Sequence, residues 1–187
     1  MEIEHWPTVR QAIELLPPVQ GHYLEIGIGN GYALQYFAET GYREYKYWGL
    51  DISAEMVLRT EKMLKHLNNV RLFHADFLQW RPPEPIRFDL VFSMEVFYYF
   101  EAIQAGIDKA ASLLCPGGTL MVLVNYYEEN PGSHGWPEKL NVPMRLWSKA
   151  DYLEGFGKAG LRNVRQERLV HPGRPDEPGT LATWASR

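Results

Sequence analysis

The sequence predicts an α/β fold: a doubly wound, mostly parallel seven-stranded sheet with helices on both faces and a C-terminal antiparallel hairpin. Three observations predict it. Strand-like apolar runs alternate with segments of helical period, which is typical of parallel strands joined by right-handed crossovers. Residues 120–124 are continuously apolar, as expected for a strand covered on both faces. The last two strand-like runs have no helix between them, so we expect them to pair antiparallel.

Each element follows from a local signal. Ser53 is a natural helix N-cap, and Gly41 is placed to end the helix before it. Pro116 stops a helix, and Gly117-Gly118 turns the chain into the strongest strand. The expected elements are a capping helix within residues 1–19, between Pro7-Thr8 and Pro17-Pro18, a strand at 22–26, a helix at 32–40, a strand at 45–50, a helix at 53–67, strands at 70–74 and 88–93, a helix at 100–114, a strand at 119–124, a helix at 149–159 and strands at 164–169 and 180–185.

Length and composition limit the class of protein. The 187 residues correspond to one domain, and 45% hydrophobic with 22% charged residues is a globular composition. No apolar run approaches the roughly 20 residues of a membrane span, and the N-terminus has no signal-peptide core, so we expect a cytoplasmic protein without membrane contact. The single cysteine, Cys115, excludes an internal disulfide and a thiolate metal site, and we expect no metal. A net charge of −4 argues against a nucleic-acid substrate.

A glycine-rich turn follows the first expected strand, in residues 23–31 with the sequence Tyr-Leu-Glu-Ile-Gly-Ile-Gly-Asn-Gly. Glycine adopts backbone angles closed to other residues and lets a ligand lie against the chain, and a helix N-terminus behind it offers free N–H groups. In the dinucleotide fingerprint Gly-x-Gly-x-x-Gly the third glycine comes one position later. Glu25 would also repel a pyrophosphate. We therefore expect a cofactor without phosphate.

The pattern acid-x-Gly-x-Gly-x-Gly resembles the first motif of the class I (Rossmann-like) S-adenosylmethionine-dependent methyltransferases. Further segments resemble later motifs of the same family in the expected order: residues 74–77, residues 88–96 and residues 114–120. Together they cover roughly residues 20–124. The resemblance implies S-adenosyl-L-methionine as the cofactor and S-adenosyl-L-homocysteine as its product. It also implies a C-terminal hairpin.

The resemblance assigns cofactor roles to residues at the carboxyl ends of the strands, where doubly wound sheets bind ligands. Asp51 is expected to accept hydrogen bonds from both ribose hydroxyls, although a carboxylate there could also cap the next helix. Asp76 would accept from the adenine amine, although it could also only cap a turn, and Glu25 would help to position the methionine ammonium. The predicted cofactor-binding residues are Glu25, Gly27, Gly29, Gly31, Asp51, Ile52, Asp76, Phe77, Ser93 and Met94.

Acceptor contacts are expected from aromatic residues after the fourth and fifth strands, because aromatic faces can enclose a planar or cationic group. Residues 125–147 have no helical or strand period, and so long a connection is usually a functional loop. The predicted substrate-binding residues are Tyr99, Tyr127 and Trp136. The candidate catalytic residues are His134, which is the loop's one side chain that titrates near neutral pH, and Tyr126.

The sequence therefore predicts a methyltransferase that moves the methyl group of S-adenosylmethionine to a small-molecule acceptor by in-line displacement. Such a transfer needs mainly alignment and exclusion of water, and a base only for some acceptors. The alternatives are a methyltransferase for protein or RNA side groups and a cofactor-binding protein without turnover. The acceptor atom, the use of a base, the pathway and the oligomeric state stay open.

Overall fold

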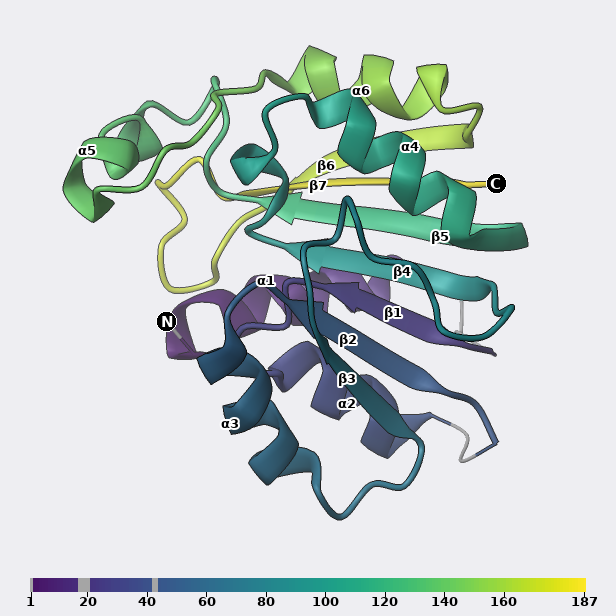
Figure 1. The fold of residues 1–187 in the computed structure, drawn as a ribbon. Coiled ribbons are helices and arrows are strands. Elements are labelled where there is room, and N and C mark those ends of the chain that lie inside the picture. The colour runs from purple at the N-terminus through teal and green to yellow at the C-terminus, as the bar shows by residue number, and fades with distance from the viewer. Residues whose placement is uncertain (1, 17–20, 42–43) are drawn as a thin grey trace.

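The computed structural model describes residues 2–16, 21–41 and 44–187, which form one seven-stranded sheet with helices on both faces (Figure 1). The strand order is β3-β2-β1-β4-β5-β7-β6. The predicted doubly wound fold is confirmed. The elements are α1 (Glu2–Glu14), β1 (Tyr23–Ile26), α2 (Tyr32–Thr40), β2 (Tyr47–Asp51), α3 (Ala54–Leu64), β3 (Val70–His74), β4 (Phe88–Met94), the 3-10 turn η1 (Phe97–Tyr99), α4 (Ile103–Leu113), β5 (Leu114–Val124), the 3-10 turn η2 (Pro131–Ser133), α5 (Trp136–Leu140), α6 (Lys149–Lys158), β6 (Arg162–Leu169) and β7 (Thr180–Ser186).

The order in which successive strands join the sheet reverses between β1 and β4. These two strands are parallel neighbours, although β2 and β3 lie between them in the sequence. The strands β2 and β3 therefore follow β1 toward one edge of the sheet, and the later strands follow β4 toward the other edge. In an open α/β sheet such a switch point is where ligands bind, beyond the carboxyl ends of the strands. β7 pairs antiparallel with both β5 and β6, which confirms the predicted hairpin.

Two hydrophobic cores sandwich the sheet. Leu24 and Ile26 of β1 point into the core that contains Ile107 of α4 and Phe156 of α6. The opposite core receives side chains of α1, α2 and α3, with Leu34 fully buried. Burying one such side chain contributes roughly 1.5–3 kcal/mol, so the sheet is fixed from both sides. None of the helices in the described ranges is long and apolar enough to cross a membrane.

Three segments differ most from the expected elements, and the bounds of several others, including α3, α4 and β2, differ by one to three residues. α1 begins at Glu2 and contains Pro7, which was expected to precede the helix, while the expected Pro17-Pro18 stop lies outside the described residues. β5 begins at Leu114 rather than at residue 119, because Leu114 pairs with Phe88 across an irregularity in the ladder. The long connection after β5 contains η2 and α5. Helices of three and five residues are too short to produce a period in the sequence.

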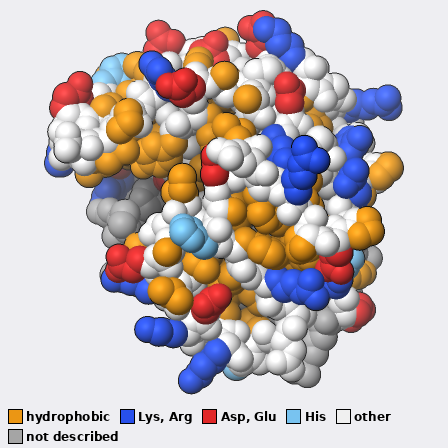
Figure 2. Space-filling model, in the orientation of Figure 1, with side chains coloured by type: hydrophobic (Ala, Val, Ile, Leu, Met, Phe, Trp, Pro, Cys, Tyr) orange, Lys and Arg blue, Asp and Glu red, His pale blue; other side chains and the backbone are white. Residues whose placement is uncertain are grey.

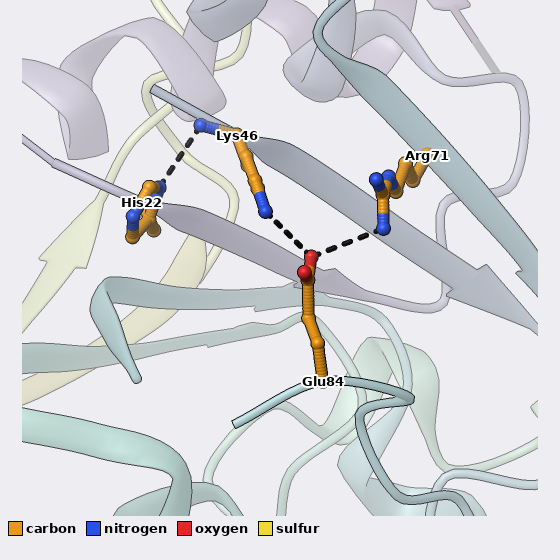
Figure 3. Close-up of polar contacts among 4 residues, drawn as sticks. All are labelled: His22, Lys46, Arg71 and Glu84. Carbon is orange, nitrogen blue, oxygen red and sulfur yellow. Dashed lines mark hydrogen bonds and ion pairs between the residues drawn. The ribbon is translucent and has the colours of Figure 1, made fainter. Parts of the chain in front are cut away.

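An ion cluster fixes the connection between β3 and β4, which has no helix to cover the sheet. Glu84 Oε1 accepts hydrogen bonds from Lys46 Nζ at 2.6 Å and from Arg71 Nη1 at 3.0 Å (Figure 3). The backbone N–H of Lys46 in turn donates to His22 Nδ1 at 3.0 Å. These cations hold the pKa of Glu84 below its usual value, with the hydrogen bond from Lys46 as the largest cause. The cluster joins the start of β2 to β3 at the end of the sheet opposite the strand carboxyl ends.

Candidate active site

A large cavity lies at the carboxyl ends of the parallel strands, across the β1–β4 switch point. Its volume is about 1260 Å³, and its wall includes Gly27 after β1 and Met94 at the end of β4. Figure 1 shows that α5, the β6–β7 connection and the N-terminal helix all lie at this end of the sheet. Figure 2 shows hydrophobic side chains on the projecting α5 region, beside a hollow in the surface. The position is the one that the fold predicts for a ligand.

The three glycines of the β1–α2 turn have different tasks. All have left-handed backbone angles, with φ of 74° at Gly27, 50° at Gly29 and 76° at Gly31. A Cβ atom on Gly27 would lie 2.2 Å from Val96 Cγ2, and one on Gly31 would lie 2.5 Å from Thr60 Cγ2. A Cβ on Gly29 would meet no protein atom within 4 Å. Gly27 and Gly31 therefore permit close packing, whereas Gly29 exposes bare backbone to the cavity.

Asp51 links the glycine turn to helix α3. Its Oδ2 accepts from the Gly29 N–H at 2.9 Å, and its Oδ1 accepts from the Ser53 N–H at 2.8 Å. Asp51 lines the cavity and is half-buried. An ionised carboxylate has about four lone-pair sites, so both oxygens can accept a further hydrogen bond. The sequence left capping and ribose binding as alternative roles for Asp51. In this geometry the carboxylate can do both.

Glu25 is buried beneath the glycine turn. Its Oε2 accepts from the Tyr23 hydroxyl at 2.9 Å. Burial raises the pKa of Glu25 to about 8, against the hydrogen bonds from Tyr23 and the Leu34 N–H, and with a smaller contribution from the charge of Asp51. Burial and the neighbouring Glu25 also raise the pKa of Tyr23. Glu25 is not among the described residues that line the cavity. Its predicted role toward the methionine ammonium would therefore be exerted through the turn.

Asp76 lies after β3 and also lines the cavity. Its oxygens accept from the Leu78 N–H and from Gln79 Nε2, both at 2.9 Å, so it caps a turn as well as facing the cavity. Phe77 is buried and forms part of the cavity wall. Ile52 is 75% exposed and lines the same region. Together these side chains supply an acceptor beside apolar surface, which suits a flat base with an amine edge.

Ser93 and Met94 end strand β4. The Ser93 hydroxyl is buried and donates to the Ile26 carbonyl at 3.0 Å, which ties β4 to β1. Met94 lines the cavity, whereas Ser93 and Gly31 are not among its described lining residues. Of the ten predicted cofactor residues, the cavity thus brings together seven: Gly27, Gly29, Asp51, Ile52, Asp76, Phe77 and Met94. Their individual roles stay predictions.

The predicted acceptor residues divide into two groups. Tyr99 and Trp136 line the cavity. Tyr126 is 4% exposed and stacks on Trp136 with ring centroids 6.3 Å apart, and Tyr127 is fully buried with its hydroxyl donating to the Pro178 and Gly179 carbonyls at 3.3 Å. Neither Tyr126 nor Tyr127 is among the described residues that line the cavity. Both therefore support the wall from behind.

His134 has an exposed side chain. Its Nε2 lies 2.8 Å from the Glu128 carbonyl oxygen, and the residue is absent from the described lining of the cavity. Its neighbour Ser133, by contrast, is buried and lines the cavity. The assignment of His134 as a base stays a prediction that this geometry does not support.

Several lining residues are not evident from the sequence motifs. Glu95 directly follows β4 and lines the cavity, and an acid at a strand end is a visible signal, although the family motif points only to the neighbouring backbone. His171, Arg174 and Glu177 reach the cavity from the β6–β7 connection. No local signal could identify these three, because the connection has the composition of an ordinary hairpin loop. Thr8 of α1 joins them in the wall.

Comparison with known proteins identifies the class. Residues 24–120 match the methyltransferase domain family. The chain is also 31% identical to a chain described as a methyltransferase in a complex with the Haloferax volcanii Trm112 methyltransferase activator, with a TM-score of 0.85 over 100% of this chain and 90% of that one. No curated protein matches the sequence significantly.

Two further solved structures share the fold at lower identity. An S-adenosylmethionine-dependent methyltransferase from Mesorhizobium loti is 20% identical, with a TM-score of 0.78 over 98% of this chain and 97% of that one. The N-methyltransferase NodS from Bradyrhizobium japonicum, in complex with S-adenosylhomocysteine, is 18% identical, with a TM-score of 0.74 over 100% of this chain and 86% of that one. The chain belongs to the methyltransferase domain family and has the class I fold. The S-adenosylhomocysteine in the NodS complex is the product of the cofactor that the sequence motifs lead us to expect.

Proposed function

We propose that the protein transfers the methyl group of S-adenosylmethionine to a small-molecule acceptor held in the same cavity. The size of the cavity carries this proposal. Pockets for single small ligands usually measure about 300–1,000 Å³, whereas this cavity measures about 1260 Å³. Beyond the part lined by Gly29, Asp51 and Asp76 it continues to Tyr98, Tyr99 and Trp136. This second part provides room for an acceptor next to the cofactor.

The residues of the first part fit the cofactor. Gly29 presents backbone with open space where a Cβ would stand, and Asp51 keeps acceptor capacity for a diol. The cavity wall carries five carboxylates against two permanent cations among the described residues, which favours a ligand with positive charge. The carboxylates are Asp51, Asp76, Glu95, Glu101 and Glu177, and the cations are Lys139 and Arg174. The cofactor supplies an activated methyl group on a sulfonium.

The chain's own contribution is binding, alignment and exclusion of water. An in-line displacement gains most of its rate from correct placement of the two reactants. Three segments contribute lining residues to the second part of the cavity. Gly132 and Ser133 come from η2, Trp136 and Lys139 from α5, and Arg174 and Glu177 from the β6–β7 connection. These segments line the acceptor part of the cavity, where a bound acceptor would displace water from around the methyl donor.

Transfer can be tested with S-adenosylmethionine carrying a labelled methyl group and fractionated small-molecule extract as the acceptor source. The proposal predicts label in a product below about 1 kDa and formation of S-adenosylhomocysteine. Label in protein or RNA instead would support the macromolecular alternative. Cofactor binding without turnover on any fraction would contradict enzymatic transfer and support a binding protein. NADH should not bind, because the turn lacks the pyrophosphate spacing.

A protein partner is a second proposal with its own observation. The similarity to the methyltransferase in the Haloferax volcanii complex extends over the whole of this chain. We propose that this protein also works with an activator protein related to Trm112. Co-expression with such a protein from the same genome should give a 1:1 complex by light scattering and a higher transfer rate. Separate elution of the two proteins would contradict this proposal and leave the transfer reaction unaffected.

A further inference from the structure

Glu95 is a half-buried carboxyl group that no step of the proposed transfer has yet used. It follows β4 directly, on the opposite side of the switch point from Gly27, and lines the cavity. Its backbone is left-handed, with φ of 59°. Non-glycine residues in this conformation are uncommon, and they cluster at functional sites because the strain must be held by the surroundings. Both its position and its backbone conformation make Glu95 a candidate functional residue of the cavity wall.

Two hydrogen bonds fix the carboxyl group. Oε1 accepts from the Asn125 N–H at 2.6 Å, and Oε2 accepts from the Tyr98 hydroxyl at 3.0 Å. Each oxygen can accept one more hydrogen bond. The ends of β4, β5 and η1 therefore hold the group rigidly while its remaining acceptor capacity is available to a ligand in the cavity.

A cluster of aromatic rings adjoins this carboxyl group through Tyr98. Tyr98, which donates to Glu95, lies edge-on to Tyr99 at 4.6 Å and to Tyr126 at 5.5 Å between ring centroids. Tyr126 in turn supports Trp136. A carboxylate beside a cluster of electron-rich rings is an arrangement that binds a cation carried on an apolar body. Tyr99 is 46% exposed, so part of this aromatic surface is open to a ligand.

We infer that Glu95 binds the acceptor and takes its proton, and that the acceptor is an amine on an apolar body. This inference rests on the proposed methyl transfer and adds the acceptor class to it. The amine enters as an ammonium and donates a hydrogen bond to a Glu95 oxygen. One proton moves from nitrogen to that oxygen, which frees the nitrogen lone pair. The lone pair forms the nitrogen–methyl bond while the methyl–sulfur bond breaks and its electron pair stays on sulfur. The positive charge thus passes from sulfur to nitrogen, and Glu95 later releases its proton to solvent.

The protonation equilibrium of Glu95 suits this task. Burial raises its pKa to about 7, against the hydrogen bonds from Asn125 and Tyr98. A base works best when its pKa is near the working pH. The titratable groups that face it are Tyr98 on η1 and Tyr152 on α6, and burial raises the pKa of both, so they stay neutral. A bound ammonium should lower the pKa of Glu95, because it stabilises the ionised form.

Binding of amine probes to protein saturated with S-adenosylhomocysteine tests the inference without any turnover. Hexylamine and phenethylamine are compared with the matched alcohols, hexanol and phenethyl alcohol, by calorimetry at pH 8. Glu95→Gln should weaken amine binding by roughly 10-fold to 100-fold, the scale of a hydrogen bond to a charged group, and leave alcohol binding within about 2-fold. Glu128→Gln, which changes an exposed carboxylate outside the described cavity wall, should behave as the parent. Equal amine affinity of parent and Glu95→Gln, including no binding to either, would overturn the inference.

Carbon NMR of labelled glutamate gives a readout that a structural role would not move. The Glu95 carboxyl should titrate near pH 7 in the parent and shift to lower pH with amine but not with alcohol. Tyr98→Phe covers the case in which Glu95→Gln does not fold, because it removes one hydrogen bond to the carboxylate and should raise the Glu95 pKa. A Glu95 pKa that is the same with and without the amine would contradict the inference. Transfer to an alcohol or thiol at equal rates in parent and Glu95→Gln would remove only the amine assignment, whereas no transfer by the parent would remove the proposed function.

Discussion

Gly29 and Asp51 are joined by a hydrogen bond of 2.9 Å across the mouth of the cofactor turn. The bond ties Gly29, where a Cβ would stand in open space, to the carboxylate at the end of β2. Because Asp51 also accepts from the Ser53 N–H, the carboxylate has a fixed position before any ligand arrives. Fixed acceptors bind a diol without the entropy cost of ordering a side chain.

Asp51→Ala should therefore weaken S-adenosylhomocysteine binding by roughly 1.5–3 kcal/mol, the scale for hydrogen bonds to a charged group. Titration calorimetry measures the loss. Asp108→Ala, on the exposed face of α4 and outside the described cavity wall, is the control for removal of a carboxylate. Unchanged affinity in a folded Asp51→Ala protein would rule out the ribose role.

Gly29→Val should abolish binding of S-adenosylhomocysteine in a protein that still folds. The added side chain meets no protein atom near its Cβ and would occupy the open space of the cavity. The left-handed backbone would cost about 1–3 kcal/mol of stability. Gly160→Val is a matched control, because Gly160 has φ of 75° and equally open surroundings but does not line the described cavity wall. If both variants lose similar stability and both still bind, the cofactor does not lie on this turn.

Glu25→Gln should stabilise the cofactor-free protein at alkaline pH. The folded-state pKa of about 8 lies above the usual 4.5, so folded protein keeps a proton that unfolded protein loses between these values. The free energy of unfolding should thus fall as pH rises from about 4.5 to 8, by at most roughly 1.4 kcal/mol per pH step of one. In denaturant unfolding at pH 8.5, the free energy of unfolding should be higher for the variant than for the parent by a few kcal/mol. This difference should disappear near pH 4. An identical pH dependence in both proteins would contradict the raised pKa. Glu95 adds a slope of the same sign and remains in both.

Glu84→Gln should destabilise the protein at neutral pH but not in acid. The pKa of Glu84 is lowered by its cations, so its contribution is present above the usual glutamate pKa and is lost as pH falls through the folded-state value. The variant should melt at a lower temperature than the parent at pH 7 and at the same temperature near pH 3. Glu55→Gln, in an exposed pair with Arg59 on α3, should change the melting temperature less at either pH. A constant difference across pH would show that the cluster acts through packing rather than charge.

Strand and helix positions were predictable where one local signal dominated. α2 and β3 occur at the expected residues, since a helix with a clear apolar face and a strand between two turns leave few alternatives. The start of β5 was not predictable. Its first residues, including Pro116, join the sheet only because β4 lies beside Leu114 and because the Gly117 N–H donates to the Arg187 carbonyl. Such pairings depend on residues far apart in the chain.

The positions of Gly27, Gly29 and Asp51 in the cavity wall were predictable, whereas their roles toward a cofactor stay predictions. Gly27 and Gly29 belong to one short turn, and Asp51 ends the neighbouring parallel strand, so the sequence motif and the strand order together place all three at the same edge of the sheet. The proposed acceptor half depends on tertiary folding. Tyr126 and Tyr127 are consecutive aromatics after a strand, and only the packing shows that both are buried behind the wall. Glu177 lines the cavity because β7 reverses direction, which residue type and spacing do not reveal.

The antiparallel direction of β7 also allows the two halves of the site to vary independently. A parallel seventh strand would begin at the far end of the sheet, and the β6–β7 connection would have to cross back to reach it. The antiparallel β7 begins at the cavity end, so the whole connection stays beside the cavity. Residues in this connection can change in length and sequence without altering the glycine turn or Asp51, which belong to strands on the other side of the switch point. New acceptor ranges could arise by exchange of one surface loop, with the methyl donor retained. Grafting this connection between relatives of the fold is therefore a direct route to redesigned selectivity.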